Sequence, residues 1–143
     1  MSRTVSTRSV TLTRDAQGVY TATNAAGDSL QFGRGEGLLS PVELLLAAVA
    51  GCSSIDVDMM TSRRAEPTRF EVTSEADYIH DDATGNILEN IRLAFDLAFP
   101  EGEEGDKARA RIAAALQISH DKECTVSRTL EAGASVSFST VQP

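Results

Sequence analysis

The sequence has no tryptophan and few other aromatic residues, with five phenylalanines and two tyrosines among 143 residues. Proteins that bind single-stranded nucleic acid stack the bases on aromatic side chains, so this sequence offers little material for such a surface. Positive charge is also scarce, since 13 lysine and arginine residues stand against 21 aspartate and glutamate residues, a formal net charge of −8. This balance argues against nucleic acid and anionic membrane surfaces as partners.

Long apolar runs are absent as well. The longest run, from Leu44 to Cys52, is far shorter than the roughly 20 residues that a membrane-spanning helix requires. Residues 1–20 alternate small polar and apolar side chains and lack the apolar segment of a signal peptide. We therefore expect a cytoplasmic protein with no membrane partner. The length and the 41% of hydrophobic residues predict one domain over residues 1–143 with a substantial core.

The sequence contains two cysteines, Cys52 and Cys124, and two histidines, His80 and His120. Their spacing matches no compact zinc motif, so we predict neither a bound metal nor a cofactor. A structural disulfide is not expected in a reducing cytoplasm. From the residues alone, the cysteines are either buried core thiols, since free cysteine is among the most buried residue types, or a redox pair.

The hydrophobic pattern predicts an α+β domain. Short strands separated by polar turns are expected up to residue 32, and a long hairpin that turns at residues 81–86 is expected after Pro67. A second helix is expected over residues 106–118, and a final hairpin over residues 125–139. The second strand of the long hairpin is expected to carry one apolar face, formed by Ile87, Ile91, Leu93, Phe95, Leu97 and Phe99.

The strongest local signal is the start of a helix at Ser40-Pro41-Val42-Glu43. Serine can cap the helix, proline fits its first turn, and glutamate three residues after the serine completes a capping box. The helix is expected to continue to about Arg63 or Arg64. Its first half is apolar around the whole circumference, so we expect it to be buried on every side by a sheet, a second helix or another subunit.

Cys52 lies in the middle of this predicted helix, where the helix dipole has little effect on a thiol. The thiolate is the reactive form of cysteine, so activation requires a nearby cation such as an arginine. The candidates are Arg14 in the first turn and Arg34 in the glycine-rich segment 33–37; we favour Arg34, because glycines let its loop fold over the helix. Glu43 can hold that guanidinium, can act only in the capping box, or can do both.

Two other polar pairs are weaker candidates. His120 beside Asp121 lies close to Cys124 in sequence, but a histidine at a helix end more commonly offsets the helix dipole than activates a nucleophile. Asp56 and Asp58 are two residues apart on the first predicted helix, so they do not share one face as an acid–base pair.

The segment SPVELLLAAVAGC, residues 40–52, followed by Ile55-Asp56-Val57, resembles the central helix of the OsmC/Ohr family. These are the osmotically inducible and organic hydroperoxide resistance proteins. The N-terminal strands, the charged hairpin, the alanine-rich second helix and the segment Glu123-Cys124-Thr125-Val126 extend the resemblance over nearly the whole chain. The resemblance implies an OsmC-like fold, with antiparallel sheets around two central helices, in an intertwined homodimer whose active sites lie at the subunit interface.

The resemblance also implies a thiol peroxidase that reduces organic hydroperoxides. Cys52 would attack the O–O bond and become a sulfenic acid, and Cys124 would condense with it to form a disulfide. Arg34 would stabilise the Cys52 thiolate and the departing oxygen, with Glu43 holding the guanidinium. A dithiol, which is a lipoylated protein in well-studied members, would reduce the disulfide.

The sequence departs from the family pattern at one important position. In well-studied peroxidases of the family, the arginine-holding glutamate directly follows the proline. Here that position is Val42 and the acid is Glu43, about 100° further around the helix. Thr13-Arg14-Asp15 resembles the turn arginine of another subfamily, which leaves Arg14 as the alternative to Arg34. The departure supports a second hypothesis, a non-catalytic homodimer that binds a small apolar ligand, with the cysteines as core thiols.

Overall fold

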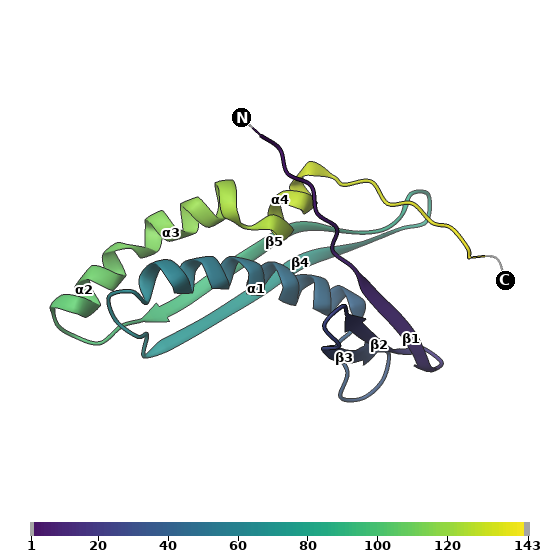
Figure 1. The fold of residues 1–143 in the computed structure, drawn as a ribbon, viewed down its shortest axis with the longest axis horizontal. Coiled ribbons are helices and arrows are strands. Elements are labelled where there is room, and N and C mark those ends of the chain that lie inside the picture. The colour runs from purple at the N-terminus through teal and green to yellow at the C-terminus, as the bar shows by residue number, and fades with distance from the viewer. Residues whose placement is uncertain (1, 142–143) are drawn as a thin grey trace. The chain divides into compact units, whose positions relative to one another are not determined.

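The first part of the chain is a three-stranded antiparallel meander (Figure 1). The computed structural model describes residues 2–141, which divide into two compact units, one ending at Leu45 and the other beginning at Leu46. Strands β1 (Val10–Ala16), β2 (Val19–Asn24) and β3 (Ser29–Gly33) pair in sequence order. Threonine and valine favour these strands, and the predicted strands are confirmed.

Helix α1 (Pro41–Thr61) begins where the sequence predicts. The Ser40 hydroxyl oxygen accepts a hydrogen bond from the Glu43 backbone N–H at 3.2 Å, and the Glu43 carboxylate accepts one from the Ser40 N–H at 2.9 Å. This reciprocal pair is a complete capping box and satisfies donors that the first helical turn leaves without partners.

Within the described chain, α1 is buried on one side only, and coverage of its other side by another subunit, which the sequence analysis allows, stays a prediction. Ala47, Ala48 and Gly51 in the first half are exposed, as is Ile55 after them. The rest of the chain packs against one side of the helix. Residues at four-residue spacing on that side are buried, and residues on the opposite side are exposed. The buried residues are Val49, Ser53, Val57 and Thr61.

By length and composition, α1 is also able to cross a lipid bilayer, a property that it shares with core helices of water-soluble proteins. It carries Asp56 and Asp58 in its second half, and charged side chains are costly in the middle of a bilayer. We therefore keep the absence of a membrane partner as a prediction.

The second unit contains a long antiparallel hairpin of β4 (Arg69–Asp81) and β5 (Gly85–Ala98). The Asp81 carboxylate accepts hydrogen bonds from the backbone N–H groups of Ala83 and Thr84, at 2.8 and 3.1 Å, and these bonds hold the predicted turn. Both sheets are antiparallel. One helix lies between them in the sequence and the others follow the second sheet, so strands and helices do not alternate and the predicted α+β class is confirmed.

A bulge interrupts β5 and corrects the predicted apolar face. Asn90 and Ile91 of β5 together lie opposite Ala76 of β4, and Asn90 has a positive φ of 52°. An extra residue reverses the alternation of side chains along a strand. As a result, Ile87 is exposed while Leu88 is half-buried, so the prediction that Ile87 shares a face with Ile91 is wrong.

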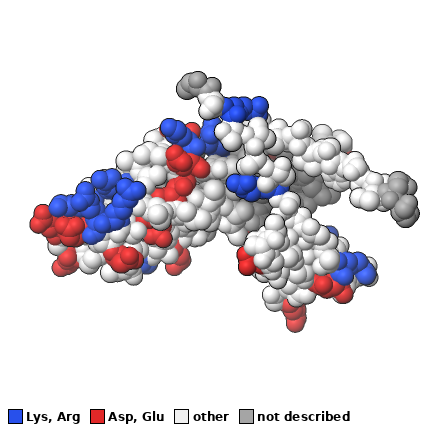
Figure 2. Space-filling model, viewed as in Figure 1, with Lys and Arg blue, Asp and Glu red and all other residues white. Residues whose placement is uncertain are grey.

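The predicted second helix is longer than expected and is divided. Helix α2 (Glu103–Ala110) begins within the acidic stretch, where carboxylates are favourable near a helix N-terminus. Arg111 separates it from α3 (Ile112–Ile118), and a π-helical turn, η1 (Ser119–Glu123), follows. Figure 2 shows acidic and basic side chains side by side over α2, where Lys107 pairs with two glutamates.

The predicted final hairpin is wrong. Helix α4 (Thr125–Ala132) replaces its first strand, and residues 134–141 have no regular secondary structure. Threonine and valine in this segment favour strands intrinsically, yet the segment is helical although none of its residues is buried. Gly133, expected in a turn, ends α4 in the left-handed conformation with φ 68°, which glycine adopts without strain.

Candidate functional site

The two cysteines occupy different environments in the second unit. Cys52 lies in the middle of α1 with a half-buried side chain, and Cys124 is 1% exposed. Both are free thiols in this structure. Cys124 stands between η1 and α4, so it begins a helix rather than the strand that the sequence predicts. Cys52 is therefore the more accessible of the two in the described chain.

The backbone around Cys124 is held by hydrogen bonds on both sides. Its N–H donates to the Ser119 carbonyl at 2.8 Å, five residues earlier, which is the spacing of a π-helix. Its carbonyl accepts from the Arg128 N–H at 3.1 Å and from the Ser127 hydroxyl at 3.3 Å. The π-helical turn thus fixes the backbone position of Cys124 at the start of α4.

A buried network of hydroxyl groups joins the two cysteine-bearing segments. The Ser119 hydroxyl donates to the Asp56 carboxylate at 2.8 Å and lies 3.0 Å from the Ser53 hydroxyl. A hydroxyl has one proton, so Ser119 donates to Asp56 and accepts from Ser53. Ser53 follows Cys52 directly in α1, and Ser119 holds the Cys124 backbone. This network therefore connects the neighbours of both thiols.

Sequence reasoning missed this network. The sequence analysis treats Asp56 only as a weak acid–base candidate with Asp58, and it includes neither Ser53 nor Ser119 among the candidate residues. The available signal was the spacing of Ser53 and Asp56, three residues apart, which places both on one side of a helix. Nothing in the sequence shows that Ser119, 66 residues after Ser53, is their partner.

The predicted activating residues, Arg34, Arg14 and Glu43, lie in the first unit. Arg34 is exposed; its backbone N–H donates to the Gly18 carbonyl at 2.8 Å. A Cβ at Gly33 would stand 2.1 Å from the same carbonyl oxygen, so only glycine allows this approach. Arg14 is an exposed residue of β1. Among residues 2–141, neither arginine side chain forms an ion pair or a hydrogen bond.

Glu43 is committed to the capping box in this structure. Its hydrogen bonds with Ser40, first from the backbone and then from the side chain, lower its carboxyl pKa below the usual value. A carboxylate has two oxygens and can accept further bonds, so a guanidinium could also be held. The role of Glu43 as an arginine partner stays a prediction.

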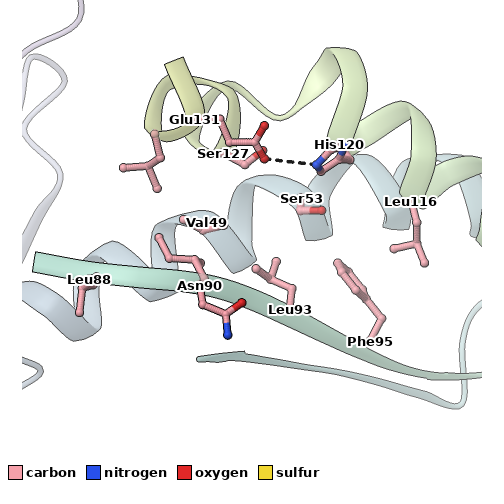
Figure 3. A pocket seen from close by; sticks show the side chains of 12 residues that line it. Val49, Ser53, Leu88, Asn90, Leu93, Phe95, Leu116, His120, Ser127 and Glu131 are labelled. Carbon is pink, nitrogen blue, oxygen red and sulfur yellow. Dashed lines mark ion pairs between the residues drawn. The ribbon is translucent and has the colours of Figure 1, made fainter. Parts of the chain in front are cut away.

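A cavity of about 470 Å³ lies between α1, β5, α3, η1 and α4 (Figure 3). Aliphatic and aromatic side chains make up most of its wall, and a few polar groups interrupt them. Asn90, the residue in the β5 bulge, is one of the polar members. The wall consists of Val49, Ser53, Leu88, Asn90, Ile91, Leu93, Phe95, Leu116, His120, Ser127, Leu130 and Glu131.

His120 joins η1 to α4 at the edge of this cavity. Its Nδ1 lies 2.9 Å from the Asp121 carboxylate, and its Nε2 lies 3.2 Å from that of Glu131, the ion pair drawn in Figure 3. The hydrogen bond to Asp121 and the charge of Glu131 raise the pKa of His120. The partners of His120 are thus carboxylates, which does not favour a Cys124–His120 nucleophilic pair. In residues 2–141, no three metal-binding side chains are grouped to hold an ion.

Comparison with known proteins identifies relatives of this fold. The family model described as "OsmC-like protein" matches residues 33–139. No curated protein matches the chain. A hypothetical protein from Aquifex aeolicus VF5 is 20% identical, with a TM-score of 0.70 and 90% of each chain covered. An OsmC-like protein of unknown function from Vibrio cholerae is 10% identical, with a TM-score of 0.65, covering 89% of this chain and 95% of that one.

A third solved structure has a name that points to an activity. It is described as an organic hydroperoxide resistance protein OsmC and predicted redox protein from Legionella pneumophila. It is 16% identical, with a TM-score of 0.53, and 90% of this chain and 91% of that chain are covered. At such identities these three structures support the fold that the chain adopts.

Proposed function

This chain belongs to the OsmC-like family, and from that membership we propose that it is a cysteine-based peroxidase that reduces organic hydroperoxides. The observation that carries the proposal is the pair of free thiols: one is half-buried on α1, the other is buried at the start of α4, and the Ser53–Ser119 hydrogen bond ties their segments together. A cysteine to be oxidised needs access to substrate, whereas a resolving cysteine needs a fixed position.

The proposed chemistry has two steps. The Cys52 thiolate attacks the outer peroxide oxygen, the O–O bond breaks, and the alkoxide leaves as an alcohol after taking a proton; Cys52 is oxidised to a sulfenic acid. The Cys124 thiol then attacks the Cys52 sulfur, so that an S–S bond forms, the S–O bond breaks and water leaves. A dithiol, such as a lipoylated protein, reduces the disulfide and restores both thiols.

Arg34 is proposed to stabilise the Cys52 thiolate and the negative charge on the departing oxygen, with Glu43 orienting its guanidinium. In support, the Arg34 side chain makes no competing ion pair among residues 2–141. Arg34→Ala should slow oxidation of Cys52, and Arg14→Ala should leave it unchanged. The reverse result, measured by loss of the free Cys52 thiol, would transfer the role to Arg14.

The protein is proposed to act as a cytoplasmic homodimer. The outward face of α1 supports this, because Ala48, Ile55 and Met59 are exposed there, and a second copy would remove them from water. Ile55 is 66% exposed and Met59 62%, and because they lie four residues apart on the helix they share one face.

The peroxidase proposal is tested by intact mass after one equivalent of cumene hydroperoxide is added to the reduced protein. The expected product has lost two hydrogen atoms and no longer reacts with an alkylating agent. Cys124→Ser should instead gain one oxygen atom at Cys52, and Cys52→Ser should gain nothing. If both thiols of the wild-type protein stay reduced and alkylatable, the peroxidase proposal is wrong.

The cavity favours a second candidate function, the binding of a small apolar ligand without catalysis. Its volume of about 470 Å³ lies in the range of small-molecule sites, and its wall is mostly apolar. A fluorescent fatty-acid probe should bind stoichiometrically, and Leu93→Trp, which fills the cavity, should abolish binding. In this alternative, peroxide leaves both cysteines reduced, so the mass measurement separates the two functions.

A further inference from the structure

We propose that Ser119 is a positioning residue for the second chemical step, in which Cys124 condenses with oxidised Cys52. The inference rests on the proposed function and adds to it a group outside the cysteines and the arginine. Ser119 touches neither sulfur in the hydrogen-bond network; it acts through the backbone that carries Cys124.

The burial of the network shows that its hydrogen bonds are structural constraints. The Ser119 side chain is 0% exposed, and Ser53 is 9% exposed. Asp56 is half-buried, whereas the Ser53–Ser119 bond is buried, so loss of the Ser119 hydroxyl leaves Ser53 without this partner and breaks the link to Asp56. Ser119 is the one member that contacts both of the others, since it donates to Asp56 and accepts from Ser53.

The same residue controls the backbone of Cys124. Its carbonyl accepts the Cys124 N–H at 2.8 Å across the π-helical turn. Single π-helical turns are uncommon and occur frequently at functional sites. Ser119 therefore fixes α1 with its side chain and the Cys124 segment with its main chain. Loss of the Ser119 hydroxyl is therefore expected to shift Cys124 relative to α1.

The two chemical steps depend differently on this position. The first step joins Cys52 to a peroxide from solution and needs no contact with Cys124. The second step forms the S–S bond and releases water, so the Cys124 sulfur must reach the Cys52 sulfur with correct alignment. A displacement of about 1 Å can slow such a step by as much as a hundredfold. Loss of the Ser119 hydroxyl should thus affect the second step selectively.

The test compares the rates of both steps in wild-type protein and Ser119→Ala. Reduced protein is mixed with cumene hydroperoxide, quenched with dimedone and acid at intervals, and analysed by mass spectrometry for sulfenic acid and disulfide. In Ser119→Ala, sulfenic acid should form at a rate within about twofold of wild type. Disulfide should form at least about tenfold more slowly, so sulfenic acid accumulates.

Two further variants distinguish positioning from general loss of stability. Thr61→Val removes a fully buried hydroxyl of α1 that, among residues 2–141, bonds only to the Val57 carbonyl of its own helix, at 2.8 Å. It should leave the ratio of the two rates unchanged. Asp56→Asn keeps an oxygen that can accept from Ser119, so it should retain most of the disulfide rate. If Ser119→Ala does not fold, Ser53→Ala takes its place and should slow the same step less.

The inference is overturned if Ser119→Ala forms disulfide at the wild-type rate, or if both steps slow equally, or if Thr61→Val changes the ratio as much. Failure of the underlying function has a different signature, because wild-type protein and Cys124→Ser would then form no sulfenic acid. The two failures are therefore separable in one set of samples.

Discussion

The two faces of α1 differ in what the chain supplies to cover them. On the inner face, Val57 is 0% exposed, and Ser53 bonds to Ser119 within the same chain. On the outer face, Ile55, only two residues away, is 66% exposed. Both faces carry large apolar side chains, so the presence of apolar residues alone does not distinguish them. The described chain covers one face of α1 and leaves apolar side chains exposed on the other, and this outer face is the one that the proposed second copy would cover.

The largest effect, loss of the folded state, is expected when a charge is placed on the inner face of α1. Val57→Asp should abolish the folded state, because an unpaired carboxylate in a buried site costs several kcal/mol, comparable with the whole stability of a small domain. Far-UV circular dichroism should show loss of helix. The matched substitution Ile55→Asp should keep the native spectrum. Equal loss of helix in both variants would show that the two faces do not differ.

A charge on the outer face should act on association. Ile55→Asp is expected to weaken the homodimer by about tenfold or more, because burying a carboxylate at an interface costs over about 1.4 kcal/mol. Sedimentation velocity of wild-type and variant protein over a range of concentrations measures this change. A wild-type protein that sediments as a monomer at all concentrations would contradict the proposed second copy.

The thiol of the more exposed residue, Cys52, should react faster than that of buried Cys124. Iodoacetamide should modify half-buried Cys52 at least about tenfold faster than Cys124, since a thiol that is 1% exposed reacts only when the structure opens. Peptide mass spectrometry after timed alkylation measures both rates. In denaturant the two rates should converge, and convergence without denaturant would remove the distinction between the cysteines.

The smallest expected effect concerns the pH dependence of the link between η1 and α4. Asp121 and Glu131 raise the pKa of His120, so protonated His120 stabilises the folded state. This contribution is fully present below the imidazole's usual pKa of about 6.5 and is lost as the pH rises through the raised pKa. Urea unfolding midpoints should fall slightly over that window, and less so in His120→Gln. The side chain is exposed, so a large fall would contradict this assignment.

Much of the fold could be predicted because its signals are local. The capping box at Ser40 and the turn after Asp81 each depend on residues within a few positions of one another. Helix α4 could not be predicted from Thr125 and Val126, because intrinsic strand preference depends strongly on context and is a weak guide by itself. The bulge at Asn90 was missed for a related reason, since one inserted residue reverses the side-chain alternation without altering composition.

The candidate site was predicted less completely than the fold. Cys52 and Cys124 stood out as the two cysteines of the sequence, and the resemblance to a family suggested their roles. The Ser119–Asp56 hydrogen bond joins residues 63 positions apart and leaves no periodic pattern. The choice between Arg34 and Arg14 as the proposed partner of Cys52 likewise concerns residues far apart in the sequence, for which there is no local pattern.

The most direct test of the central claim is turnover of an organic hydroperoxide at the expense of a dithiol. Purified protein is supplied with cumene hydroperoxide and dihydrolipoamide, and peroxide consumption is followed with time. The account predicts many turnovers per protein for the wild type, and only the uncatalysed background for both Cys52→Ser and Cys124→Ser. Consumption by the wild type that equals the background, or that persists in Cys52→Ser, would contradict it.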